Sequence, residues 1–259
     1  MEDKQKTIQL LSKSGATIQE LNSVRKRLSR VNGGKLAQLS QAKTISLVLS
    51  DVIGDPLSVI ASGPTVPNSD PDGRAWEIIQ HYRLEDRVPT AVKDILDIPT
   101  LSNIRHEPLV EQNAHNLLIG NNLRALESAA NEAIEQGFVT VVLSDRIQGD
   151  AKTLGQQFAN LGQIIARMMT DTSSLLMQEL SVVAAEHLQM DPKRCCQLER
   201  TIRRCTRDRK NLMIIGGGES TVAVVGSGRG GRNQEMALSW AVQAASFESL
   251  PPDLQGKHF

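Results

Sequence analysis

Short apolar runs alternate with longer segments of helical periodicity along this chain, and this alternation limits the folds open to it. Residues 44–50 (TISLVLS) are a β-branched apolar run that predicts a buried strand. The same patterns predict strands over 116–120, 138–144, 212–215 and 220–225, and helices over 17–31, 123–136, 151–169 and 233–245. Strands separated by helices of this length pair in parallel through right-handed crossovers. The sequence therefore predicts an α/β fold.

The first predicted helix has defined ends. Thr17 and Glu20 have the spacing of a capping box, and apolar residues follow them at helical intervals. Asn32, Gly33 and Gly34 predict the end of this helix, because a left-handed residue is readily accommodated there.

The composition of the 259 residues is globular and narrows the choice of partners. Hydrophobic residues make up 40% and charged residues 22%, which argues against disorder. The 29 basic and 29 acidic residues cancel and aromatic residues are only 3%, so no nucleic-acid or membrane partner is expected. No apolar run is long enough for a bilayer span, and the first residues do not form a signal peptide. We expect a cytoplasmic protein, with a mitochondrial location open if a targeting segment precedes the chain, and a homo-oligomer also open.

A basic stretch interrupts the pattern of strands and helices. Within residues 191–210, eight basic residues outnumber the acids: Lys193, Arg194, Arg200, Arg203, Arg204, Arg207, Arg209 and Lys210. In a chain of zero net charge, this favours a solvated helix and linker between two domains, with a partner surface as the alternative.

Two near-identical segments place a serine and an aspartate where strands end. They are LVLSD (47–51) and VVLSD (141–145). Ligands bind at the carboxyl ends of strands in open α/β sheets, although Ser-Asp there is also common turn chemistry. Two further polar turns, 62–65 and 120–122, are either ligand contacts or turns alone.

The glycine-rich loop 226–231 is the strongest candidate for a phosphate contact. Its glycines allow backbone N–H groups to approach a phosphate, and Arg229 and Arg232 add donors for phosphoryl oxygens. The loop also fits the G-x-G-x-x-G dinucleotide pattern, but residues 251–253 (PPD) cannot form the strand that this fold needs next. The sequence contains no Walker A motif.

Several ordered motifs together resemble the class II glycerate kinases, which have a Rossmann-like N-terminal domain and a MOFRL-type C-terminal domain. The motifs are VRKRLS (24–29), GGKLA (33–37), LSDVIGDP (49–56), VIASGPTVP (59–67), IGNN (119–122), QGD (148–150), GGESTV (217–222) and GGRNQE (230–235). The resemblance implies an N-terminal domain over 1–190, a basic linker over 191–210 and a MOFRL-type domain over 211–259, both domains being incomplete.

The resemblance implies ATP-dependent, Mg²⁺-assisted phosphorylation of D-glycerate to phosphoglycerate, with 2-phosphoglycerate as the expected product, in a cleft between two domains. We expect three catalytic residues. Arg232 would stabilise the moving phosphoryl group, and Asp51 or Asp55 would hold the metal or take the glycerate proton, with Asp51 the expected metal ligand. The expected residues for binding glycerate and the nucleotide are Ser62, Gly63, Asn121, Asn122, Gly217, Gly218, Glu219, Gly230, Gly231, Asn233 and Glu235.

The sequence also departs from the family pattern. It lacks the family's lysine in a Gly-Lys-Ala-Ala context and its Ser-Gly-Gly-Gly-Ser phosphate turn, and residues 246–259 match nothing in the pattern. We therefore expect a chain truncated at both ends with little turnover by itself. Two alternatives stay open: an inactive fragment that binds nucleotide or glycerate, and an NAD(P)-dependent hydroxypyruvate reductase.

Overall fold

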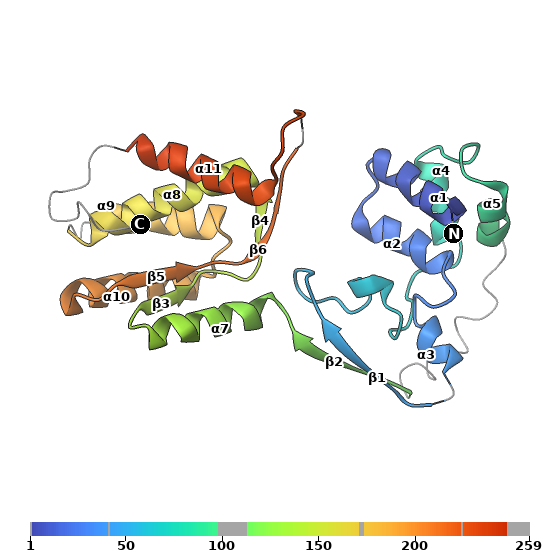
Figure 1. The fold of residues 1–259 in the computed structure, drawn as a ribbon, viewed down its shortest axis with the longest axis horizontal. Coiled ribbons are helices and arrows are strands. Elements are labelled where there is room, and N and C mark those ends of the chain that lie inside the picture. The colour runs from blue at the N-terminus through green and yellow to red at the C-terminus, as the bar shows by residue number, and fades with distance from the viewer. Residues whose placement is uncertain (1, 41, 98–112, 171–173, 224, 248–259) are drawn as a thin grey trace. The chain divides into compact units, whose positions relative to one another are not determined.

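The structure is a computed structural model that describes residues 2–40, 42–97, 113–170, 174–223 and 225–247 (Figure 1). The chain forms two compact units, Met1–Asn121 and Asn122–Phe259. Both combine helices with parallel strand pairs, so the predicted α/β class is confirmed.

Four helices of the first unit pack around one apolar core. They are α1 (Glu2–Lys13), α2 (Ile18–Arg27), α4 (Arg74–His81) and α5 (Thr90–Asp97). Their buried side chains include Leu11, Val24, Ile78, Ile79 and Val92. Helices α1, α4 and α5 are not among the helices predicted from the sequence.

The predicted capping box at the start of α2 is confirmed. The Thr17 hydroxyl accepts a hydrogen bond from the Glu20 backbone N–H at 3.3 Å, and the Glu20 carboxylate accepts one from the Thr17 N–H at 2.8 Å. The helix ends at Arg27, earlier than predicted, and Gly33 and Gly34 follow in left-handed conformations.

The remaining regular elements of the first unit are the short helix α3 (Lys35–Leu39), the single 3₁₀ turn η1 (Ile60–Ser62) and two strands. Strand β1 (Thr44–Leu49) pairs in parallel with β2 (Ala114–Gly120). The expectation that β1 is buried is wrong: Ile45, Leu47 and Leu49 are 66%, 65% and 74% exposed. Among the described residues β1 pairs with β2 alone, so alternate side chains of this two-stranded sheet point away from the unit's interior.

The second unit contains two further parallel pairs. Strand β3 (Val139–Val142) pairs with β5 (Leu212–Ile215), and β4 (Ile147–Asp150) pairs with β6 (Gly218–Thr221). Helix α7 (Asn122–Glu135) precedes β3. The long helix α8 (Ala151–Met168) lies beside α11 (Arg232–Ala245), as Figure 1 shows.

The basic stretch is a helix, as predicted, but it packs into the second unit and does not link two domains, which corrects the expected linker over 191–210. After α9 (Ser174–Val182) and a π-helical turn (Val183–His187), α10 runs over Pro192–Asp208. One face of α10 buries Cys195, Leu198, Ile202 and Cys205, and these side chains belong to the unit's core. Most basic side chains of this stretch are exposed, and the Arg194 guanidinium instead donates to the Val142 and Leu143 carbonyls at 3.5 and 3.4 Å. A count of charges alone therefore did not reveal that the segment packs.

None of the described helices is long and apolar enough to cross a bilayer. Most of the segment 246–259, which matches nothing in the family pattern, lies outside the described part of the chain.

Candidate functional site

The residues predicted for the site form two groups, one in each compact unit. Asp51, Asp55, Ser62, Gly63 and Asn121 lie in the first unit. The second unit holds the others: Asn122, Gly217, Gly218, Glu219, Gly230, Gly231, Arg232, Asn233 and Glu235. That the two groups face one cleft stays a prediction.

The parallel pairing of β1 and β2 places the polar residues that follow them at one edge of the sheet. The backbone N–H of Ser50 donates to the Gly120 carbonyl at 2.9 Å and continues the pairing past the end of β1. The Asn121 amide then donates to the Asp55 carboxylate at 2.6 Å. Asp55 has a left-handed φ of 54°, and Asp51 is exposed to solvent. The structure thus brings Asp55 and Asn121 together, as the motif positions suggested.

Ser62 is the last residue of η1, and Gly63 follows it in a left-handed conformation. Ser62 is 5% exposed, and its hydroxyl donates to the Asn22 side-chain oxygen at 3.1 Å. The carbonyls of Ser62 and Gly63 accept hydrogen bonds from the N–H groups of Gly33 and Gly34, at 3.0 and 2.8 Å. In this structure the two residues connect the turn to the chain after α2, and a direct ligand contact stays a prediction.

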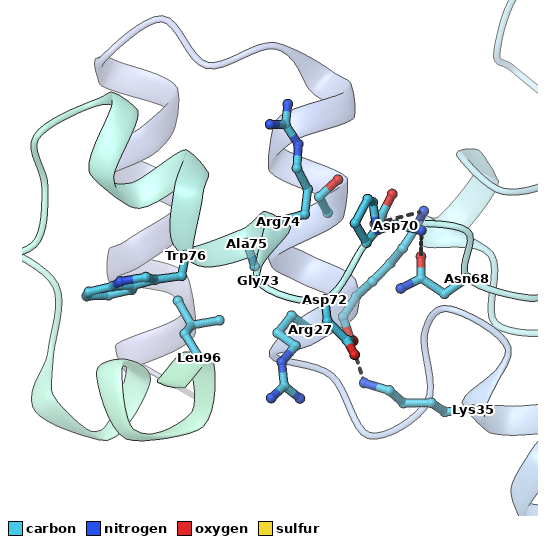
Figure 2. Close-up of a pocket in the computed structure, with 13 residues that line it drawn as sticks. Arg27, Lys35, Asn68, Asp70, Asp72, Gly73, Arg74, Ala75, Trp76 and Leu96 are labelled. Atoms are coloured by element: carbon cyan, nitrogen blue, oxygen red, sulfur yellow. Dashed lines mark hydrogen bonds and ion pairs between the residues drawn. The ribbon is translucent and has the colours of Figure 1, made fainter. Parts of the chain in front are cut away.

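A small pocket beside this turn is lined by charged groups that the sequence analysis did not select (Figure 2). Lys26 forms an ion pair with Asp70 at 3.5 Å, and the Lys35 ammonium donates to the carbonyls of Lys26 and Ser29 at 2.8 and 2.7 Å. Burial, assisted by the nearby positive charge of Arg27, lowers the pKa of Lys35. The pocket measures about 30 Å³, which holds a water-sized species and is too small for glycerate. Lys26 lies in the VRKRLS motif and Lys35 in the GGKLA motif. Their place in these motifs was the sequence feature that could have marked them as candidate site residues.

The second unit contains a larger cavity of about 320 Å³. It lies where β4, β6, α7, α8 and α11 meet, and several predicted residues line it. The lining consists of Asn122, Leu126, Ile147, Leu154, Phe158, Gly216, Gly217, Gly218, Ser220, Arg232, Asn233 and Met236. The structure therefore brings Asn122, Gly217, Gly218, Arg232 and Asn233 to one cavity.

Close packing within the unit surrounds the glycines at this cavity and leaves no room for a side chain at Gly218. A Cβ on Gly217 would overlap the side chain of Asn122, whose amide donates to the Asp145 carbonyl at 2.6 Å. A Cβ on Gly218 would overlap the backbone of Ile147 in the paired strand. These contacts explain the glycines without a ligand, although they also keep the cavity wall free of side chains.

Arg232 begins α11 and connects that helix to β6. Its guanidinium donates to the Glu219 carboxylate and, at 3.4 Å, to the Ser220 carbonyl. Gly231 caps the helix with an extended backbone, and its carbonyl accepts from the Glu235 N–H at 3.0 Å. Gly230 lies in the exposed loop before this cap. Arg232 therefore places a half-exposed positive charge at the edge of the cavity, where it can bind an anionic group.

Two family descriptions match the chain. Residues 1–97 match the "Domain of unknown function (DUF4147)", and residues 212–252 match the "MOFRL family".

The curated relatives carry two kinds of name, glycerate kinase and hydroxypyruvate reductase. A "Glycerate kinase" of Macaca fascicularis is 41% identical over 243 residues, which are 92% of this chain and 60% of that protein. A "Glycerate 2-kinase" of Pyrococcus horikoshii is 33% identical over 96% of this chain and 49% of its own length. A "Putative hydroxypyruvate reductase" of Agrobacterium vitis is 35% identical over 93% of this chain and 52% of its length.

The crystal structure of a glycerate kinase from Thermotoga maritima has a TM-score of 0.62 and 34% identity. It matches 93% of this chain and 48% of its own chain. The chain thus spans about half the length of most curated relatives that it matches.

Proposed function

Because this chain belongs to the class II glycerate kinase family, we propose that its function is the ATP-dependent phosphorylation of D-glycerate, with 2-phosphoglycerate as product. The observation that carries the proposal within the chain is Arg232, held by Glu219 at the cavity of the second unit. Phosphoryl transfer depends on positioning and on charge neutralisation more than on covalent chemistry, and a preorganised guanidinium supplies both.

The acids of the first unit supply the second part of the proposal. Asp55 is oriented by the Asn121 amide and would accept the proton of the glycerate hydroxyl. Asp51, exposed after β1, would hold Mg²⁺. Mg²⁺ is usually bound by one or two carboxylates together with substrate phosphates, so a single exposed aspartate fits it. Over the described residues, no three His, Cys, Asp or Glu side chains gather to hold a metal by themselves. When bound, Mg²⁺ would neutralise phosphate charge.

Charge and composition support small-molecule partners for this activity. The formal net charge of zero gives no general attraction for nucleic acids or anionic membranes. We also propose a cytoplasmic location.

The test is a phosphoryl-transfer assay with D-glycerate, ATP and Mg²⁺, in which ADP release is coupled to NADH oxidation and the product is identified by ³¹P NMR. We expect glycerate-dependent ADP release and one phosphoglycerate isomer. NADH oxidation by hydroxypyruvate in the absence of ATP would instead favour a reductase. Nucleotide binding without transfer, under conditions that support an active family member, would favour a binding role.

A further inference from the structure

The cavity of the second unit has an apolar wall that glycerate cannot use. Leu126, Ile147, Leu154, Phe158 and Met236 all contribute to its lining. Each of the three carbons of D-glycerate carries an oxygen, so this substrate has no apolar face to bury. Small-molecule sites in proteins are mostly apolar with a few placed polar groups and start at about 300 Å³. The lining therefore indicates a ligand that has a substantial apolar portion.

The polar groups of the cavity indicate what the rest of that ligand carries. Arg232 places a cation at the lining, and a guanidinium suits phosphoryl oxygens through paired donors. Asn122 and Asn233 add amides, which can both donate and accept, as the edge of a nucleobase requires. A flat apolar ring with a polar edge, joined to phosphates, satisfies all three features.

The walls of the cavity are fixed before any ligand arrives. Phe158 comes from α8 and Met236 from α11, and these helices pack so closely that Gly155 leaves no room for a Cβ against the Met236 carbonyl. The Ser239 hydroxyl also donates to the Lys152 carbonyl at 2.7 Å, and the Gln243 amide donates to Asn160 at 3.1 Å. A preformed site loses less conformational entropy on binding.

We infer that this cavity binds the nucleoside end of the phosphate donor, a nucleoside triphosphate, with Arg232 beside its phosphates. The inference rests on the proposed function for the identity of the donor. It assigns the cavity to the nucleotide and not to glycerate. Phe158 and Met236 become residues that bind the base, a role that the sequence motifs did not indicate.

Binding to the 259-residue chain tests the assignment. Calorimetry would measure the Kd of ADP and of D-glycerate, and saturation-transfer NMR would detect adenosine. Phe158→Ala should raise the Kd of ADP and of adenosine about tenfold, a usual loss of affinity when an aromatic contact with a base is removed. Met236→Trp should fill the cavity and abolish binding of both. Arg232→Ala should raise the Kd of ADP and leave the affinity for adenosine unchanged.

The matched control is Leu238→Ala, a truncation on the same helix α11 of a side chain that is 62% exposed and outside the cavity lining. Melting curves of every variant show that it is folded. Phe158 and Met236 both pack against the core, so each variant is interpreted only if its melting curve shows that it is folded, and either one alone gives a reading.

The inference is overturned if the chain does not bind ADP, if ADP affinity is the same in the folded cavity variants, or if Met236→Trp removes glycerate binding and spares ADP. These outcomes are separable from a failure of the proposed function. ADP binding that depends on Phe158 without transfer to glycerate would retain the cavity assignment and refute the kinase. If the protein transfers phosphate to glycerate and Phe158→Ala and Met236→Trp leave the KM for ATP unchanged, the kinase function is retained and the cavity assignment is refuted.

Discussion

Arg232 donates from its guanidinium to the carboxylate of Glu219, thirteen residues earlier in the chain, and so connects the start of α11 to β6. Both side chains are nearly half exposed, at 47% and 46%. An exposed ion pair of this kind contributes little to stability. The ion pair instead orients the guanidinium at the cavity, and the remaining N–H groups of Arg232 can donate hydrogen bonds to a ligand.

Arg232→Ala should lower kcat for glycerate phosphorylation by about 10²–10³, the usual effect of removing one preorganised donor to a developing charge. The coupled ADP-release assay measures it. Arg203→Ala is the matched control, since Arg203 is an exposed, ion-paired arginine on α10. A loss below about threefold for Arg232→Ala would remove this residue from the catalytic group.

Glu219 should act through Arg232 rather than on the substrate. A double-mutant cycle with Glu219→Ala and Arg232→Ala should therefore be non-additive in kcat/KM, with a coupling of about 0.5–3 kcal/mol expected for residues in contact. Glu219→Gln should be milder than Glu219→Ala, because the neutral amide can still accept the hydrogen bond. Additive losses would mean that Glu219 has a separate role.

Close packing of α8 on α11 makes Gly155 sensitive to the smallest enlargement. Gly155→Ala would press a methyl group against the Met236 carbonyl, and overpacking of this kind lowers the free energy of unfolding by about 1–3 kcal/mol. Gly162→Ala on the same helix α8 is the matched control, since nothing lies within 4 Å of its added Cβ. Helix propensity should make Gly162→Ala neutral or stabilising by up to about 1 kcal/mol. Thermal unfolding of the two variants measures the difference, and equal melting temperatures would contradict the packing.

The elements that the sequence predicted correctly are those specified by local chemistry. Thr17 and Glu20 define a helix start within four residues, and the β-branched run over 44–50 defines a strand. The exposure of Ile45 was not predictable, because it depends on which strands lie beside β1. The helix in the basic stretch was predicted, but the surrounding arginines suggested a solvated helix, and the burial of Leu198 and Ile202 was missed.

Part of the candidate site could likewise be predicted from the sequence, and part depends on tertiary packing. The motif glycines and Arg232 are visible in the sequence, and the structure brings Arg232 to the cavity. The apolar wall was not predictable as a site, because Phe158 and Met236 read as ordinary helix-core residues. Their facing a cavity depends on how α8 packs against α11, which is a tertiary contact without a local signal.

If Asp51 is the proposed Mg²⁺ ligand, Asp51→Asn should raise the Mg²⁺ concentration for half-maximal activity by about tenfold or more, since even outer-shell changes cost this much. The ATP KM measured at saturating Mg²⁺ should change less. Asp94→Asn, an exposed aspartate on α5, is the control for removing one negative charge. An unchanged Mg²⁺ requirement would assign the metal to another group.

The capping box of α2 should make the first unit sensitive to acid. The backbone N–H of Thr17 lowers the pKa of Glu20 below 4.5, and the Tyr82 hydroxyl, which donates to the same carboxylate at 2.9 Å, acts in the same direction. A depressed pKa in the folded state stabilises the fold above the unfolded pKa, and this contribution is lost as pH falls through the folded value. Glu20→Gln should therefore lower the free energy of unfolding by less than about 1 kcal/mol at neutral pH, because the Gln amide oxygen can still accept the capping hydrogen bonds but carries no charge. The difference from the original protein should shrink as the pH falls below 4.5. Urea unfolding of both proteins in a Trp240→Phe background measures it at each pH, because the fluorescence then comes from Trp76, which packs against this core. A stability difference that persists unchanged in acid would show that the cap does not depend on the charge of Glu20.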